Sequence, residues 1–353
     1  MGGNKGTHRI FIGTYTKAGS EGIYSISLDA ASGALGEPRA AAKAPSPTFL
    51  ALSPDKRFLY AVCASGVWAS SFAIEPSGDL RPVRQDPPGK GPTPCHVRID
   101  STGRLALAAN YHSAQAAVIP LGGDGSIGEP SVVSHSGSGP NPKRQQQAHV
   151  HSAYFSPDGR FALVCDLGLD RIYTYEIGRS PASLRPGNPP YASSAPAAGP
   201  RHLSFNLEGT RAYVINELDS TIVTYEFQAG NGGLKARGSV SVLPAGYRGE
   251  ATAAEVCVHP NGRHVFGSCR GPDTISVFSV DPKSGDLAPA GIYPCGGKGP
   301  RSFALSPGGE WLVCAHQDSN TLCSFKVDPE TGALERVPGT VSVSMPVCVT
   351  FLD

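Results

Sequence analysis

Ser156-Pro157-Asp158-Gly159-Arg160-Phe161 is the clearest copy of a turn motif that occurs six times along the chain. The starts of consecutive copies are separated by 47, 56, 50, 53 and 47 residues. The six copies begin at Ser53, Asp100, Ser156, Asn206, His259 and Ser306. A repeat of roughly 40 to 50 residues is typical of the blades of a β-propeller. The motif therefore predicts at least six blades.

Each copy of the motif joins two apolar runs. Thr48 to Leu52 precede the first copy, and Phe58 to Val62 follow it. Because Pro and Gly supply the turn geometry, each motif predicts a β-hairpin. A third alternating segment follows, as at Ile172 to Glu176, and some repeats then have a second turn of the form Asp-Pro-x-x-Gly, as at Asp281 to Gly285. A short strand after that turn completes a four-stranded antiparallel blade.

The two ends of the chain complement each other. Arg9 to Tyr15, Gly22 to Leu28 and a segment from Ala34 onward supply three strands without a first strand, whereas Val347 to Phe351 is a first strand with nothing after it. Joined, they make a seventh blade and leave only short, protected edges. The sequence therefore predicts an all-β fold, a single domain over residues 1–353. We expect a seven-bladed β-propeller with four-stranded antiparallel blades, closed by strands from both termini.

Composition narrows the class of partner. The formal net charge of the 353 residues is +1 and the basic residues are scattered, which argues against nucleic-acid and membrane partners. The nine cysteines show no C-x-x-C spacing and several lie in apolar strand patterns. The first residues, Met1 to Gly6, contain no apolar segment, and no run is long enough to span a bilayer. We expect a cytoplasmic protein with a small-molecule or protein partner.

Candidate site residues follow from a register shared by the blades, because the first strand of each propeller blade lines the central channel. The position eight residues before the turn glycine holds His151, Arg201 and Arg301, with Cys95 and Ala254 in two further blades. The next position adds His96, His202 and Glu255. Seven or eight residues after the glycine, at the end of the second strand, stand Asn110, Asp166, Glu217, Arg270 and Gln317. Since a hairpin returns the chain to its starting side, we expect both sets at one rim.

Two interpretations of this charged set are open. Charged side chains that line a narrow channel lower the stability of a fold unless they form ion pairs or take part in binding or catalysis. The set therefore indicates either an active site or an ion-pair network between neighbouring blades. A single histidine such as His202 or His264 is more often a structural residue than a catalytic one.

The segment Gly137-Ser138-Gly139-Pro140-Asn141-Pro142-Lys143-Arg144-Gln145 continues into His149-Val150-His151 and then into an apolar strand. Cations and histidines at the entrance of a strand are typical of a functional site. His149 and His151 are close in sequence, but no carboxylate or third histidine stands at a convincing metal-ligand spacing. We therefore expect no metal and no cofactor.

These motifs resemble those of a known family. The resemblance covers nearly the whole chain and is carried by Gly137-Ser138-Gly139-Pro140, His149-Val150-His151, Asp166-Leu167-Gly168, Gly199-Pro200-Arg201-His202, Asn216-Glu217-Leu218, Ala254-Glu255-Val256, Arg270-Gly271 and Pro300-Arg301-Ser302-Phe303-Ala304. The chain is similar to the seven-bladed propeller lactonases, which include bacterial 6-phosphogluconolactonases and fungal 3-carboxy-cis,cis-muconate lactonizing enzymes. The resemblance implies the same propeller. One departure is Cys269, where relatives often have Asn.

The resemblance also implies the catalytic set, which is His151, Arg201, Glu217 and Arg270. His151 is expected to be the base that activates water, and the arginines are expected to hold an anionic substrate and stabilise negative charge. We expect the substrate to be an anionic lactone or carboxylate. The substrate-binding candidates are His96, Arg144, His149, Asp166, Glu255, Arg301 and Gln317.

Three functions remain open at this point. The first is hydrolysis of a sugar lactone, in particular 6-phosphogluconolactone. The second is cycloisomerisation of a muconate, and the third is a non-enzymatic propeller that binds protein partners. Both substrates carry several negative charges, so the arginines alone do not distinguish the first two functions.

Overall fold

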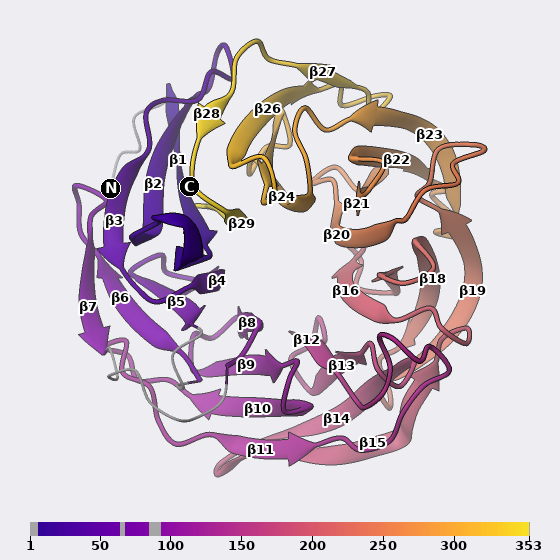
Figure 1. Cartoon of the computed structure of the whole chain (residues 1–353). Helices are drawn as coiled ribbons and strands as arrows, with labels where there is room; N and C mark the ends of the chain where they lie inside the picture. Colours follow the sequence, from indigo (N-terminus) through magenta and orange to yellow (C-terminus); the bar gives the residue numbers. More distant parts are fainter. Residues whose placement is uncertain (1–5, 64–67, 85–92, 353) are drawn as a thin grey trace.

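Seven β-sheets stand in a ring around a central axis, like the blades of a propeller (Figure 1). The computed structural model describes residues 6–63, 68–84 and 93–352. Residues 1–5, most of the first segment in which the sequence shows no apolar stretch, lie outside this range. Within the described residues the sole helix is a short 3₁₀ turn, η1 at Thr16–Ala18, and no helix could cross a membrane. The predicted all-β propeller is confirmed.

The blades are numbered here from the first complete one. Blade 1 consists of β4 (Pro47–Leu52), β5 (Phe58–Cys63), β6 (Ser70–Ile74) and β7 (Leu80–Arg84). Blade 2 consists of β8 (His96–Ile99), β9 (Leu105–Asn110), β10 (Gln115–Pro120) and β11 (Ser131–Ser134). Blade 3 consists of β12 (Val150–Phe155), β13 (Phe161–Asp166), β14 (Arg171–Arg179) and β15 (Ala182–Ser193). Blade 4 consists of β16 (Pro200–Phe205), β17 (Arg211–Asn216), β18 (Thr221–Gln228) and β19 (Gly233–Ser241). Blade 5 consists of β20 (Thr252–Val258), β21 (His264–Arg270), β22 (Thr274–Val280) and β23 (Leu287–Pro294). Blade 6 consists of β24 (Pro300–Leu305), β25 (Trp311–His316), β26 (Thr321–Val327), β27 (Leu334–Arg336) and the short β28 (Val341–Ser342).

Blade 7 is the closing blade, and it contains both ends of the chain. Its strand order is β29 (Pro346–Phe351), β1 (Thr7–Thr14), β2 (Gly22–Asp29) and β3 (Arg39–Lys43). β29 pairs antiparallel with β1, from Ile10 opposite Phe351 to Gly13 opposite Cys348. Val347 and Cys348 are 3% and 2% exposed. The predicted closure by strands from both termini is confirmed. The outer strand begins at Arg39 rather than near Ala34. The residue after Ala34, Leu35, forms only an isolated bridge with Leu28.

The repeated motif forms the turn between the first two strands of blades 1 to 6. In the copy that begins at Ser156, its hydroxyl accepts the N–H of Phe161 at 2.9 Å and donates to Asp158 at 2.6 Å. Gly159 has φ +67°, in the left-handed region that glycine adopts without strain. The same left-handed position is a glycine in five of the six copies and Lys56, with φ +57°, in the first copy. The motif thus recurs because a side-chain acceptor and a residue with positive φ satisfy the same tight turn each time.

The apolar core lies between blades rather than in one centre. One cluster packs β13 and β14 of blade 3 against β16 and β17 of blade 4, through Phe161, Leu163, Leu203 and Val214. Another joins the closing blade to blade 6 and includes Ile10. Each sheet is therefore buried against its two neighbours, and an open ring would expose an apolar face on each side of the gap.

We predict that a chain truncated before residue 345 loses most of its stability, because it loses β29 and opens the ring. Burial of each valine side chain stabilises a fold by about 1.5–3 kcal/mol, and the deletion also leaves the edge of β1 unpaired. Thermal denaturation followed by circular dichroism measures the effect. A synthetic peptide of residues 345–353 should restore part of the lost melting temperature. A truncated chain that melted like the full chain would contradict this role for β29.

Candidate active site

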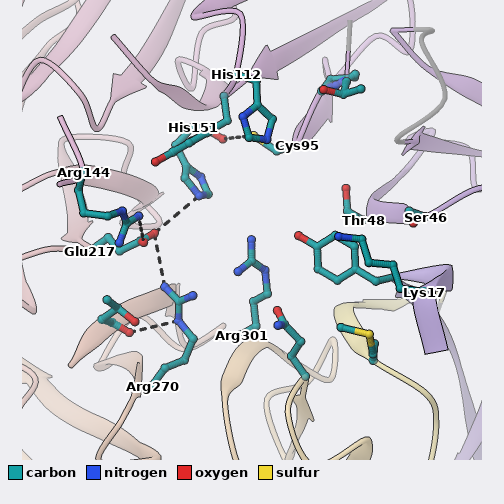
Figure 2. Close-up of a pocket in the computed structure, with 17 residues that line it drawn as sticks. Lys17, Ser46, Thr48, Cys95, His112, Arg144, His151, Glu217, Arg270 and Arg301 are labelled. Carbon is teal, nitrogen blue, oxygen red and sulfur yellow. Dashed lines mark hydrogen bonds and ion pairs between the residues drawn. The ribbon is translucent and has the colours of Figure 1, made fainter. Parts of the chain in front are cut away.

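A cavity of about 760 Å³ is lined by residues from all seven blades (Figure 2). Because blades all around the ring contribute, the cavity lies on the central axis. A much smaller cavity of about 20 Å³ adjoins it and shares five lining residues, which are Tyr15, Thr48, Cys95, His151 and Arg301. The predicted site residues divide between these two cavities and the structure that surrounds them.

Three channel-facing residues occupy the same structural position in different blades. In the pairing of the first two strands, the inner strand has one extra residue at His151, Arg201 and Arg301. Such a β-bulge redirects the side chain of the extra residue. The corresponding bulge in blade 1 is Thr48, which also lines the main cavity. The position eight residues before the turn glycine therefore faces the cavities in these blades because the inner strand is bulged there.

In the described parts of blades 2, 4, 5 and 6, the second strands contribute through one shared position at their ends. Glu217, Arg270 and Gln317, which stand eight residues after the turn glycine, line the main cavity. The same position in blade 2 is Tyr111, which lines the cavity and was missed from the sequence. Asp166 stands seven residues after its glycine and does not line the cavity. Use of the eight-residue register in every blade would have found Tyr111 and left Asp166 out.

Asp166 instead anchors the loop that precedes β12. Its Oδ1 accepts the N–H groups of His149, Gly168 and Leu169 at 2.8, 3.0 and 3.1 Å. Its Oδ2 lies 2.6 Å from Nδ1 of His135, a residue that the sequence analysis did not single out. Because the carboxylate is fully buried and occupied by these contacts, the geometry gives Asp166 a structural role.

The segment 137–149 lines the cavity through Arg144 and does not fill it. The segment is fixed by Gln145, whose side-chain amide donates to the carbonyl of Leu167 and to Asp170, both at 2.8 Å. The His149 ring stacks on Tyr111 with a centroid distance of 4.1 Å, and its Nδ1 lies 3.0 Å from the Tyr111 carbonyl. His149 does not line the cavity, so it supports the cavity wall from behind.

Glu217 is the centre of the charged cluster. Arg144 donates to its Oε1 at 2.6 Å, and Arg201 donates to its Oε2 at 2.9 Å. Arg270 lies 3.4 Å from Oε2 (Figure 2). Burial by itself would raise the pKa of Glu217, but Arg270, Arg201, His151 and Arg144 together hold it well below its usual range. Glu217 is therefore ionised at neutral pH.

His151 lies next to this carboxylate, with Nε2 at 3.8 Å from Oε2 of Glu217. Burial, followed by the positive charge of Arg201, lowers the pKa of His151 well below its usual value, and Glu217 offsets only part of this effect. The imidazole is therefore neutral at neutral pH and has a free lone pair. Because a neutral imidazole can accept a proton, His151 is a candidate general base.

Two arginines of the cluster differ in access to the cavity. The Arg201 side chain is 3% exposed and is held by Glu217 and by the Ala254 carbonyl. The Arg270 side chain is 18% exposed and donates to the carbonyls of Thr252 and Ala253 at 3.3 and 3.2 Å. Burial lowers the pKa of Arg270 to about 10, so it remains charged. Arg270 can therefore contact a molecule bound in the main cavity directly, whereas Arg201 lines the small cavity and is hydrogen-bonded to Glu217.

The remaining predicted residues lie deeper along the axis. Glu255 lines the small cavity, and its Oε1 lies 2.9 Å from Nδ1 of His202. Burial raises the pKa of Glu255 to about 7, because Arg201 and Arg98 offset only part of the desolvation. His96 is fully buried between the rings of Phe49 and Tyr154 and lines neither cavity.

The sequence predicted that the two sets of channel residues meet at one rim of the propeller. Five of these residues line the same cavity as Arg144; they are His151, Glu217, Arg270, Arg301 and Gln317. Arg201 and Glu255 lie at the adjoining small cavity, and His96, His149 and Asp166 surround the site. Within the described part of the chain, no group of three or more His, Cys, Asp or Glu side chains is arranged to hold a metal ion.

Comparisons with known proteins agree with this geometry. Residues 9–351 match the family model described as "Lactonase, 7-bladed beta-propeller". The chain is 37% identical over 346 residues to the 6-phosphogluconolactonase of Bacillus subtilis (strain 168), with 97% of each chain covered. It also resembles the solved structures of a putative 6-phosphogluconolactonase from Bacteroides fragilis, with TM-score 0.91, 30% identity and full coverage of both chains, and of the periplasmic gluconolactonase PpgL from Pseudomonas aeruginosa, with TM-score 0.91, 32% identity and coverage of 98% and 99%. The chain belongs to the seven-bladed β-propeller lactonase family.

Proposed function

We propose that this protein hydrolyses an anionic sugar lactone, with 6-phosphogluconolactone as the first substrate to test. The observation that carries the proposal is a neutral His151 beside an ionised Glu217 in a cavity rich in arginine. Family membership supports hydrolysis, since the matching model is a lactonase and relatives are named 6-phosphogluconolactonase.

The charge of the main cavity supports an anionic substrate. Among the residues that the structure describes, four cationic side chains, those of Lys17, Arg144, Arg270 and Arg301, line it against one carboxylate, that of Glu217. Excess positive charge in a concave, partly desolvated site attracts anions and is relieved when one binds. The cavity volume of about 760 Å³ is within the range that accommodates a small organic ligand.

In the first step, Nε2 of His151 accepts a proton from a water molecule as its oxygen attacks the lactone carbonyl carbon. The new C–O bond gives a tetrahedral oxyanion, and Glu217 stabilises the imidazolium that forms 3.8 Å away. Arg270 can donate to the oxyanion from the same side of the cavity.

In the second step, the tetrahedral intermediate collapses and the bond between the carbonyl carbon and the ring oxygen breaks. The leaving ring oxygen takes the proton from His151, which restores the neutral base. The product is an open-chain hydroxy acid, which ionises and releases one proton. Arg201 contributes by holding Glu217 in the orientation that faces His151.

Product analysis tests the proposed reaction. The protein should hydrolyse a sugar δ-lactone and release acid, which a pH indicator detects in weak buffer, over a panel of lactones with and without a 6-phosphate. Mass spectrometry in H₂¹⁸O should find one ¹⁸O atom in the product. Cycloisomerisation of a muconate incorporates no solvent oxygen, so that result, with no activity on any lactone, would favour the alternative enzyme. No turnover of either class would favour a protein-binding propeller.

His151→Ala should lower kcat by about 10²- to 10⁴-fold with a modest change in KM, because the variant loses proton transfer but keeps the arginines. Steady-state kinetics on the best lactone of the panel measures both constants. His112→Ala is the matched control, since His112 also lines the cavity but is not among the described residues that form ion pairs with Glu217. An alanine variant of His151 with near-normal kcat would place the base elsewhere.

The acid limb of the pH profile should lie below pH about 6.5, the usual pKa of histidine. Burial and Arg201 lower the pKa of His151, so the base is protonated and lost only as the pH falls through this lowered value. A profile of kcat/KM from pH 4 to 9 measures the limb. Arg201→Gln removes one of the lowering charges and should shift the limb to higher pH. An acid limb above pH 7 in the wild-type protein would contradict a neutral His151.

A further inference from the structure

The main cavity has two walls that differ in charge balance. On one wall, Glu217 forms ion pairs with Arg144 and Arg270. On the other wall, Arg301 and Lys17 have no carboxylate within ion-pair distance among the described residues. Figure 2 shows Arg301 pointing into the middle of the cavity, with Glu217 on one side and Lys17 on the other. The unbalanced positive charge is therefore concentrated opposite the catalytic cluster.

Tyr15 organises these two cations. The guanidinium carbon of Arg301 and Nζ of Lys17 each lie 5.8 Å from the centroid of the Tyr15 ring. A cation–π contact orients a cation but leaves its charge and its N–H donors available. Arg301 is half-buried and Lys17 is exposed, so the pair extends from the interior of the cavity to its mouth.

We propose that Arg301, Lys17 and Tyr15 form a subsite for a phosphate monoester that bridges blade 6 and the closing blade, so that the bound anion strengthens the closure of the ring. The identity of the substrate that carries the phosphate rests on the proposed lactonase function. The subsite itself is tested with inorganic phosphate.

The donors of this wall suit a dianion with several oxygens. A guanidinium presents N–H groups in a fork that matches phosphate, and a lysine adds a second charge on a flexible stem. The hydroxyl-bearing residues Ser46 and Thr48 line the same side of the cavity, as Figure 2 shows. Burial and then the nearby charge of Arg301 lower the pKa of Arg201, so an anion beside Arg301 would also relieve repulsion between these arginines.

The subsite residues come from the two sides of the ring closure. Arg301 is the bulge residue of β24 in blade 6. Tyr15 and Lys17 follow β1, and the N–H of Tyr15 donates to the carbonyl of Met345, the residue before β29, at 3.1 Å. The hydroxyl of Ser344 donates to the carbonyl of Ala18 at 2.9 Å. An anion held by both Arg301 and Lys17 therefore binds only the closed ring, and such a ligand raises the melting temperature.

The first experiment measures the melting temperature of the full chain as inorganic phosphate is titrated, against sodium chloride at equal ionic strength. The wild-type protein should gain several degrees at saturation. Arg301→Gln and Lys17→Gln remove the charge with little loss of volume and should raise the apparent Kd for phosphate by about tenfold or more. The matched controls are Arg104→Gln and Lys143→Gln, which make the same changes at residues that do not line the cavity.

The outcomes separate the possibilities. Equal stabilisation of the wild-type protein and of both subsite variants would overturn the proposal, because the anion would then bind at the Glu217 wall. Stabilisation by chloride to the same extent would also overturn it. Melting temperatures without phosphate and circular dichroism spectra show whether each variant is folded, and Arg301→Lys should retain part of the response.

The second experiment compares a sugar lactone with its 6-phosphate. Arg301→Gln should lower the ratio of kcat/KM for the phosphorylated substrate over the unphosphorylated one by about tenfold or more. An unchanged ratio would overturn the subsite even if the protein is a lactonase. A wild-type protein that hydrolyses neither lactone but shows the predicted phosphate response would refute the proposed function and support the subsite.

Discussion

The antiparallel pairing of β29 with β1 is the contact on which the rest of the structure depends. It joins the last strand of the chain to the first, with Cys348 opposite Gly13. The space for this pairing is tight, since a Cβ atom on Gly13 would lie 2.4 Å from the carbonyl oxygen of Pro47 in blade 1. The cavity takes residues from all seven blades, so this one ladder determines whether the site exists. Loss of this strand pairing would therefore both destabilise the fold and disrupt the cavity.

Within the closed ring, one buried carboxylate organises the polar interior. Glu217 is 4% exposed, and three arginines from separate segments surround it. An unpaired carboxylate at this depth would be protonated, and unpaired arginines would repel one another. The cluster fixes the charges of its members: Glu217 negative, Arg270 positive and His151 neutral. The ion-pair network expected as an alternative to an active site is present, and in the proposed reaction the same contacts prepare a base and a charge-stabilising group. The two interpretations describe one arrangement.

In the proposed reaction, the two walls of the cavity divide the tasks of a hydrolase that acts on an anion. On the Glu217 wall the charges are paired with one another, and this wall holds His151, the proposed proton-transfer group. On the Arg301 wall, the described contact of Arg301 is a cation–π contact with the Tyr15 ring rather than an ion pair with a carboxylate, so its positive charge is not neutralised. In the proposed reaction, the first wall carries out chemistry and the second wall binds the charged end of the substrate. Because the second wall spans the ring closure, substrate binding and closure would reinforce each other.

The sequence by itself determined the seven blades, the closure by both termini and, apart from Lys17, the charged residues that line the cavity among those described. It could do so because the turn motif has local requirements that recur in six of the seven blades, and because His151 and Arg301 stand at a fixed distance from the turn glycine. Only the tertiary structure decided which register position faces the cavity. Several inner strands are bulged, and it is the position at the end of the second strand that distinguishes Tyr111 and Glu217, which line the cavity, from Asp166, which anchors a loop. A one-residue shift reverses the face of a strand, and the pKa of His151 depends on charges that fold in from other blades.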